Sequence, residues 1–426
     1  MMKKKRLCSV IIAIILIALP LISCEASPSP RIFTRPDVSI SANNITDAFS
    51  VSRPDTILVE EKFVLNTADF SVELFQNVFS QNVNSNSLVS PLSVLFALGM
   101  TANGAGGETL EQMERVLAGG ISIERLNNNL FSYREELISE HNSILETANS
   151  IWFRDYGGIN IDNSFLETNK RYFDACAFRA PFNSQTVSDI NNWVYYNTFG
   201  MINRVVNYIP PDAIMYLINT IAFYSEWETR FGNIHDAAFT DINGAAQTIS
   251  FMEGRGNRAI RGDDFVGFKK PYYNHHYSFM AIMPDSHVDF SDFVDSLTGE
   301  KFMSILDKAN ALSIDVVMPK FEFNSSISLS GAIKDMGIVD AFDIDTADFN
   351  RIGTAPLPIH IGDVLHSTFI SVDEIGTRAA AATTVIMFGC SAEPPPEQII
   401  LNRPFMFSII DNSSNLPLFI GAFLTD

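Results

Sequence analysis

Apolar residues recur at mixed three- and four-residue spacing along much of the first half of the chain, and this spacing predicts amphipathic helices. The predicted helices span 66–81, 91–100, 108–117 and 189–206. The second of them is apolar all round, which predicts that it is buried. Ser90 as N-cap and Pro91 in the first helical position mark where this helix begins.

Runs rich in β-branched and aromatic residues dominate the later part of the chain and predict strands. They span 148–153, 216–224, 277–283, 311–318, 366–372 and 405–410. Helices therefore cluster early and strands late. This order argues for an α+β fold with more than one sheet, and against a repeating βαβ barrel.

The first 24 residues have the pattern of an export signal. Lys3, Lys4, Lys5 and Arg6 precede an apolar stretch over 9–22. Fourteen residues rise roughly 21 Å as a helix, which is short of the ~30 Å hydrocarbon core of a membrane. We therefore expect an exported protein and no transmembrane helix at this end.

The signal ends in Leu21-Ile22-Ser23-Cys24, which resembles a bacterial lipobox, in which the cysteine is acylated and becomes the new N-terminus. We expect lipidation of Cys24 and anchoring to the cell envelope or to the outer face of a membrane. An ordinary signal peptide with a chance cysteine, which would release the protein to the extracellular space, is the alternative.

A Ser-, Pro- and Asn-rich stretch follows over 25–60 and predicts a flexible tether. A globular domain is expected over 61–426, with no second linker. The amphipathic run over 66–81 is its first recognisable element.

Composition narrows the function. The 426 residues include 46% apolar and 18% charged side chains, which excludes a disordered chain. The net charge of −20 repels nucleic acid, so we expect no nucleic-acid partner. Four cysteines are too sparse for a disulfide framework.

Motifs of catalysis are missing from the sequence. There is no G-x-S-x-G elbow, Gly-rich phosphate loop or H-E-x-x-H pair. We expect no enzymatic activity, no cofactor and no metal site. A hydrolase would need a nucleophile and base that no motif supplies.

The segment 369–407 carries conflicting local signals. The alanines Ala379, Ala380, Ala381 and Ala382 favour a helix, whereas the run 383–388 favours a strand. One continuous element satisfies neither preference, which suggests a segment with two states.

At these residues the chain resembles the serpin family, over about 61 to 426. The most specific matches are 86–117, 376–383, Asn402-Arg403-Pro404-Phe405 and Leu418-Phe419-Ile420-Gly421. The resemblance, which extends to prokaryotic lipoprotein serpins, implies three β-sheets and about nine helices. It also implies an exposed reactive-centre loop, about 376–395, that serves as bait for a protease.

The resemblance implies suicide-substrate inhibition. The Ser or Cys of the protease forms an acyl-enzyme at the bait bond, and the cut loop then inserts into the central sheet with the protease attached. Fourteen inserted residues span roughly 46 Å, enough to carry a protease from one end of such a domain to the other. We expect a monomer whose partner is a serine or cysteine protease held in a covalent complex.

Insertion requires that alternate side chains face the buried side of the sheet. With Thr377 buried, the inward residues are small or apolar; they are Thr377, Ala379, Ala381, Thr383, Val385 and Met387. The outward residues are Arg378, Ala380, Ala382, Thr384, Ile386 and Phe388. Many inhibitory relatives carry an acidic residue where this chain has Arg378, but that position faces solvent.

Two readings of this stretch stay open. The hinge, which comprises Gly376 through Thr383, has no proline and no inward charge, and this favours inhibition. An alanine-rich linker in a non-inhibitory binding or scaffolding protein of the same fold is the alternative.

The bait bond lies between Cys390 and Ser391 if Gly376 is the fifteenth residue before it, as in typical family members. A cysteine suits elastase-like pockets and papain-like cysteine proteases. Met387 or Phe388 would suit a chymotrypsin-like enzyme if the register slips. An exposed thiol with a redox role is the alternative for Cys390.

Further residues match family positions beneath the place where the central sheet opens. Ser90, Ser93, Asn219 and His366 match the shutter, and Trp227 matches the breach at the top of that sheet. A polar network at the shutter could hold the sheet closed. Ser90 is also explained as an N-cap, Ser93 as a satisfied helix serine, and Trp227 as ordinary core.

Overall fold

A computed structural model of the protein describes residues 34–138, 144–155, 158–273, 275–309, 313–377 and 397–425. The chain from Arg35 onward forms one compact unit. Its α-helices are α1 (Glu61–Gln81), α2 (Pro91–Ala102), α3 (Gly107–Ala118), α4 (Ile123–Ile138), α5 (Asn163–Phe173), α6 (Ser184–Asn197), α7 (Phe290–Asp295), α8 (Gly299–Asp307) and α9 (Ser330–Asp335). Two short 3-10 helices are η1 (Thr46–Ala48) and η2 (Asp340–Phe342).

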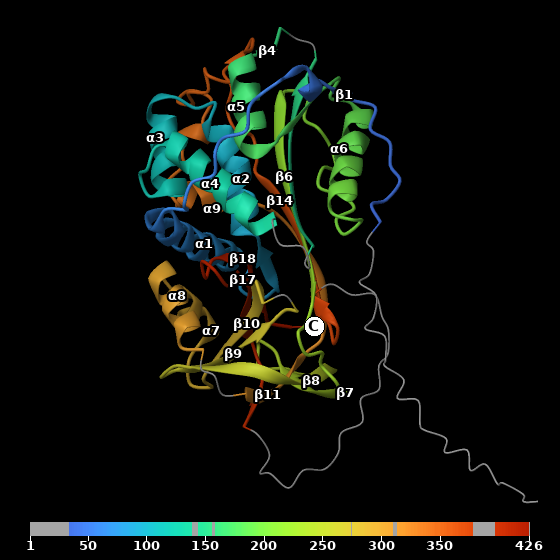
Figure 1. The fold of residues 1–426 in the computed structure, drawn as a ribbon, viewed down its shortest axis with the longest axis vertical. Helices are drawn as coiled ribbons and strands as arrows, with labels where there is room; N and C mark the ends of the chain where they lie inside the picture. The colour runs from blue at the N-terminus through green and yellow to red at the C-terminus, as the bar shows by residue number, and fades with distance from the viewer. Residues whose placement is uncertain are drawn as a thin grey trace, which may run out of the picture. The chain divides into compact units, whose positions relative to one another are not determined.

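A seven-stranded central sheet carries α6 on one face and α2 on the other (Figure 1). Its order is β1 (Asn43–Asn44), β5 (Cys176–Ala180), β3 (Ile144–Arg154), β6 (Met215–Glu226), β15 (Gly376–Thr377), β14 (Leu365–Val372) and β12 (Phe321–Ser328). The pair β3–β6 and the pair β12–β14 are long antiparallel ladders. The two-residue β15 is the strand that joins them.

The second sheet has nine strands. Eight follow the order β16 (Gln398–Ile400), β11 (Ser313–Pro319), β8 (Ala246–Arg261), β9 (Phe265–Pro271), β10 (Tyr277–Pro284), β17 (Phe405–Asp411), β18 (Pro417–Phe423) and β2 (Ser87–Val89), and β7 (Ile234–Thr240) pairs with β8. A third, two-stranded sheet joins β13 (Gly353–Thr354) to β4 (Asn160–Ile161). The predicted α+β fold with three sheets is confirmed, and each predicted strand overlaps an observed one.

Helix α2 begins as the sequence predicts. The Ser90 hydroxyl accepts a hydrogen bond from the backbone N–H of Ser93 over 3.4 Å, and Pro91 occupies the first turn. Nearly every side chain of α2 is buried, because the helix packs against α1, β6 and β18. No helix in the described part of the chain is long and apolar enough to cross a membrane.

The predicted helix over 189–206 is displaced in the structure. Helix α6 begins earlier, because Asn183 and Thr186 form a capping box at its start. It ends at Asn197, after which Phe199 and Gly200 adopt positive φ angles of 51° and 76°. A left-handed residue ends an α-helix whatever the apolar spacing beyond it. Helix α1 also begins five residues before the predicted start of its apolar run, at Glu61.

The predicted tether over 25–60 is wrong for residues 35–60, which are docked on the domain. Asn43 and Asn44 form β1 at the edge of the central sheet. The Arg35 guanidinium lies 4.8 Å from the Tyr196 ring and 4.9 Å from the Phe199 ring. Polar composition misled the prediction, because the backbone of Asn43 and Asn44 pairs with β5 and the Arg35 side chain bonds to Asn197 and Glu146. The remainder, 25–33, and the signal over 1–24 lie outside the described residues.

Candidate functional site at the opening of the central sheet

A tight turn between β14 and β15 reverses the chain into the central sheet. The carboxylate of Asp373 accepts hydrogen bonds from the backbone N–H groups of Ile375, at 2.8 Å, and Gly376, at 3.1 Å. Its side chain is buried, and burial raises the pKa of Asp373 while these two donors act in the opposite direction. The turn brings Val372 opposite Thr377, so β14 and β15 form a hairpin.

Strand β15 lies between β6 and β14 at one end of the sheet. Gly376 pairs with Glu226 and Thr377 with Ser225, antiparallel to β6. A Cβ atom on Gly376 would lie 2.2 Å from the carbonyl oxygen of Ser225, so a larger residue does not fit this approach. Thr377 is buried at 2% exposure, and its hydroxyl is hydrogen bonded to that of Tyr272.

Beyond β15 the central sheet is closed by side chains alone. No strand pairing joins β6 to β14 directly in the part of the chain that the structure describes. A cavity of about 10 Å³, room for roughly one water molecule, lies between them. The lining residues of this gap are Met201, Ile202, Ile221, Phe223, Phe369, Ile370, Ser371, Thr377, Ile409 and Phe419.

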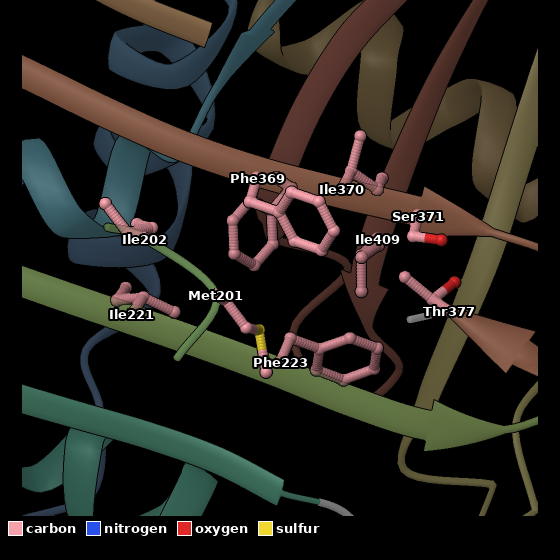
Figure 2. A pocket seen from close by; sticks show the side chains of 10 residues that line it. Met201, Ile202, Ile221, Phe223, Phe369, Ile370, Ser371, Thr377 and Ile409 are labelled. Atoms are coloured by element: carbon pink, nitrogen blue, oxygen red, sulfur yellow. The ribbon is translucent and has the colours of Figure 1, made fainter. Parts of the chain in front are cut away.

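The gap connects two hydrophobic clusters on opposite faces of the sheet. Figure 2 shows Met201 and Phe369 between the two strands, and these belong to the cluster beneath α6. Phe223 and Ile370 belong to the main core on the other face. A strand that inserted here would have to separate the apolar side chains that β6 and β14 place in the gap. No backbone hydrogen bonds between these two described strands would have to be broken.

One end of the shutter ties β6 to α2. The Ser93 hydroxyl donates to Oδ1 of Asn219, and Nδ2 of Asn219 donates to Oδ1 of Asn149 over 2.8 Å. Asn149 on β3 is paired directly opposite Asn219 and donates to the carbonyl of Phe173 over 2.7 Å. Sequence analysis missed Asn149, since its role follows from the strand register.

The other end of the shutter ties β14 to the start of α2. The backbone N–H of Ser90 donates to Nε2 of His366 over 3.1 Å, and the Ser90 hydroxyl donates to the carbonyl of Leu418 over 2.8 Å. Burial lowers the pKa of His366 to about 4, so its imidazole is neutral near pH 7. The structure thus brings together the four predicted shutter residues, and both strands that border the gap are fastened to one helix terminus.

Trp227, the residue predicted for the breach, is hydrogen bonded to the β14–β15 turn. Its backbone N–H donates to the carbonyl of Ile375 over 2.8 Å, and its indole N–H donates to the carbonyl of Asp373 over 2.7 Å. The indole ring is stacked on Tyr272 with ring centroids 4.6 Å apart. An ion pair of 2.8 Å between Lys320 and Glu374 adds a further contact to the same turn.

The remaining predicted site residues lie outside the described residues. These are Cys24, the hinge from Ala379 to Thr383, the alternative bait residues Met387 and Phe388, and the predicted bond Cys390–Ser391. The described chain resumes at Glu397 and forms β16 beside β11. Among the described residues, no group of three or more His, Cys, Asp or Glu side chains could hold a metal ion.

Comparison with known proteins gives consistent matches. The family model described as "Serpin (serine protease inhibitor)" matches residues 65–425. An uncharacterized serpin-like protein of Thermococcus kodakarensis is 29% identical over 409 residues, which covers 92% of this chain and 93% of the relative. Human glia-derived nexin is 26% identical over 368 residues and covers 82% of this chain and 90% of its own.

Solved structures of serpins are also similar to this chain. The crystal structure of the thermophilic serpin tengpin in the native state has a TM-score of 0.84 at 43% identity, and covers 90% of this chain and 100% of its own. Tengpin in the latent state has a TM-score of 0.78 at 43% identity, over 87% of this chain and 100% of its own.

Proposed function

The chain belongs to the serpin family, whose members are in general protease inhibitors and not catalysts. We propose that this protein traps a target protease as a covalent acyl-enzyme by inserting its cut loop between β6 and β14. The target would be an extracellular elastase-like or chymotrypsin-like serine protease, or a papain-like cysteine protease. The inhibitor would be consumed in the reaction.

The register of β15 is the observation that carries this proposal. Gly376 and Thr377 are aligned with both neighbouring strands. Because β15 is antiparallel to β6 and to β14, continuing it would form hydrogen bonds on both sides. With Thr377 facing the core, the period of two places Ala379, Ala381 and Thr383 inward, and each is small enough for the narrow gap.

Insertion would replace the side-chain contacts between β6 and β14 with two ladders of backbone hydrogen bonds, one to each strand. Each new backbone hydrogen bond contributes roughly 0.5–1.5 kcal/mol net, so a strand of about fourteen residues supplies ample driving force. The shutter and the breach oppose the change until the loop is cut, since they hold both strands and the turn in place. Cleavage frees the loop to move, and the closed sheet is then the less stable form.

The bait bond we propose is Cys390–Ser391, with Met387 or Phe388 as the bait if the register is shorter. A small apolar side chain fits an elastase-like pocket, and a trypsin-like enzyme has no Arg or Lys there. A panel of elastase-, chymotrypsin-, trypsin- and papain-like proteases tests this directly. We expect an SDS-resistant complex with the elastase-like member, and a released C-terminal peptide that begins at Ser391.

Two results would contradict inhibition. Cleavage of the loop with no complex, for every protease in the panel, would indicate a non-inhibitory binding or scaffolding protein. A thermal unfolding midpoint that is the same before and after nicking would show that no strand had inserted. A complex that forms with a different member, or a peptide that begins at Phe388 or Gly389, would change the target class but leave trapping intact.

We also propose that the protein is exported and anchored through lipid on Cys24, where it would protect the surface of the cell. The apolar stretch and the sequence Leu21-Ile22-Ser23-Cys24 support this proposal. Radiolabelled palmitate should be incorporated by the full chain and lost in Cys24→Ala. A labelled alanine variant, or an unlabelled native chain in the membrane fraction, would contradict it.

A further inference from the structure

A second pocket lies on strands that take no part in the opening of the central sheet. It is formed by β7, β8, β11 and β16, and the first three of these lie together at one end of the domain (Figure 1). Its volume of about 250 Å³ is far above the ~10–15 Å³ that one water molecule needs, so it has room for a side chain. Its lining includes His235, Phe251, Glu253, Val317, Ile400 and Asn402, none of which belongs to the gap, the shutter or the breach.

Backbone hydrogen bonds fix the walls of this pocket. Val317 on β11 is paired with Glu253 on β8 and with Ile400 on β16. At the far wall, the backbone N–H of Thr240 donates to the carbonyl of Asn402 over 2.9 Å, which joins β7 to the residues that follow β16. The pocket is therefore already formed before any partner binds.

The pocket combines an apolar wall with one carboxylate that lacks a donor. Val317 and Ile400 are aliphatic, and the ring of Phe251 is stacked on that of His235. The Glu253 side chain is 40% exposed, and within the described chain its carboxylate accepts no hydrogen bond. Nδ1 of His235 lies 3.7 Å from that carboxylate, which is too long for a hydrogen bond, and it balances the charge only when the imidazole is protonated.

We propose that this pocket is a second contact site for the target protease, and that it takes a lysine or arginine side chain from the surface of that enzyme. The aliphatic stem of the guest lies on Val317 and Ile400, and its cation is paired with Glu253. Lysine and arginine have the required chemistry, since each carries donors and no acceptor at the end of a stem that packs on apolar surface. This inference rests on the proposed function and adds a requirement on the target beyond its specificity pocket.

The place of the pocket along the chain supports this partner. Strand β16 begins at Gln398, seven residues after Ser391 of the proposed bait bond. Seven residues span at most about 25 Å. A folded enzyme of about 220 residues has a radius of gyration near 17 Å. A protease held at the bait bond is therefore large enough to extend over β16 and the pocket beside it.

The charges support the same partner. The net charge of −20 attracts a positively charged surface over a long range. Other charged side chains on these strands are already paired, Arg255 with Asp315 over 3.3 Å and Arg261 with Glu397. Glu253 is thus the carboxylate that lines the pocket and is open to an incoming cation.

Binding of the full chain to an inactive protease tests the inference. The probe is an elastase-like protease whose active-site serine is replaced by alanine, so that no bond is cut or formed, and calorimetric titration gives the Kd. Glu253→Gln keeps the shape of the side chain and removes its charge, and we expect it to weaken binding at least fivefold. Asp236→Asn is the matched control, because Asp236 is exposed on the opposite face of β7, and it should change the Kd by less than twofold.

A smaller loss in Glu253→Gln, or an equal loss in Asp236→Asn, would overturn the inference. The thermal unfolding midpoint of Glu253→Gln should equal that of the native chain, which separates a lost contact from misfolding. Ile400→Ser provides a second variant, since this side chain is exposed on β16, and it should weaken binding at least threefold. Native affinity in the serine variant would refute the contact with the apolar wall.

The proposed function fails in a different way. The active protease would then cleave the loop without forming an SDS-resistant complex, although the inactive form could still bind through Glu253. When both proposals hold, Glu253→Gln should slow formation of the SDS-resistant complex at least fivefold and leave the trapped fraction unchanged. Unchanged rates together with efficient trapping would refute the second contact site and leave the proposed function intact.

Discussion

The backbone N–H of Ser90 donates a hydrogen bond to Nε2 of His366 over 3.1 Å, in the interior of the domain. This geometry requires a lone pair on Nε2 and therefore a neutral imidazole. It joins the start of α2 to β14, one of the two strands that would have to part. The adjacent Ser93 joins the same helix to β6 through Asn219. A single helix terminus thus holds both sides of the gap.

Protonation of His366 should weaken this attachment. Burial lowers its pKa to about 4 in the folded state, compared with about 6.5 for an exposed histidine. The contribution of neutral His366 to the free energy of unfolding is therefore complete above pH 6.5 and is lost as the pH falls from 6.5 to 4. The loss is about 3 kcal/mol by linkage.

Chemical unfolding at pH 4.5 to 7.5 checks this prediction. His366→Gln keeps an acceptor for Ser90 but does not titrate, so its stability should be flatter over the same range. Comparing the two chains removes the contribution of the carboxylates. Equal slopes for the native chain and the glutamine variant would show that His366 does not contribute.

The buried amide of Asn149 should contribute measurably to closure. Asn149→Ala leaves Nδ2 of Asn219 and the carbonyl of Phe173 without their partners, and an unsatisfied buried polar group costs about 1–3 kcal/mol. We expect a fall of that size in the free energy of unfolding of the intact protein. Asn128→Ala on α4, where the half-buried side chain donates only to the carbonyl of Glu124 in the same helix, should change it by less than about 0.5 kcal/mol. Similar losses in both variants would argue against a special role for the shutter.

The difference between these residues explains what sequence can and cannot predict. Ser90 and Pro91 form a local signal, since capping and the first helical turn involve residues within three positions of one another. The family resemblance pointed to Asn219, and the structure places its side chain in a hydrogen bond with Ser93. Asn149 gives no local signal, because its partner lies 70 residues away and the pairing depends on the register of β3 and β6.

The docked N-terminal segment has the same physical explanation. A Ser- and Asn-rich stretch is typical of a flexible linker, but Asn43 and Asn44 meet an open edge of the sheet at β5. Arg35 likewise finds two aromatic rings on and after α6. Hydrogen-bonding partners on a distant surface change the state of a polar segment, and they are known only once the fold is known.

The inward position of Thr377 predicts opposite results for two adjacent substitutions. Thr377→Arg would place an unpaired charge where the structure has a side chain that is 2% exposed, which costs about 3–5 kcal/mol. Insertion should slow, and the protein should become a substrate that is cleaved without trapping. Arg378→Glu, at the next residue of the chain, should change little. SDS gels of each variant with the same protease measure the trapped and cleaved fractions, and equal trapping by both would refute the assignment of faces.

Gly376 should be required for the docking of β15, because the space beside it is filled by backbone. A Cβ atom would lie 2.2 Å from the Ser225 carbonyl oxygen and 2.9 Å from Cα of Glu226, and neither can move without disrupting β6. We therefore expect Gly376→Ala to expel β15, to expose Thr377 and to increase cleavage without trapping. Proteolysis of the intact variant at 372–377 should accelerate at least threefold. Gly362→Ala, where a Cβ atom meets nothing within 4 Å, is the control. An alanine variant that traps as efficiently as the native chain would show that docking of β15 before cleavage is dispensable, and that insertion begins from a loop held wholly outside the sheet.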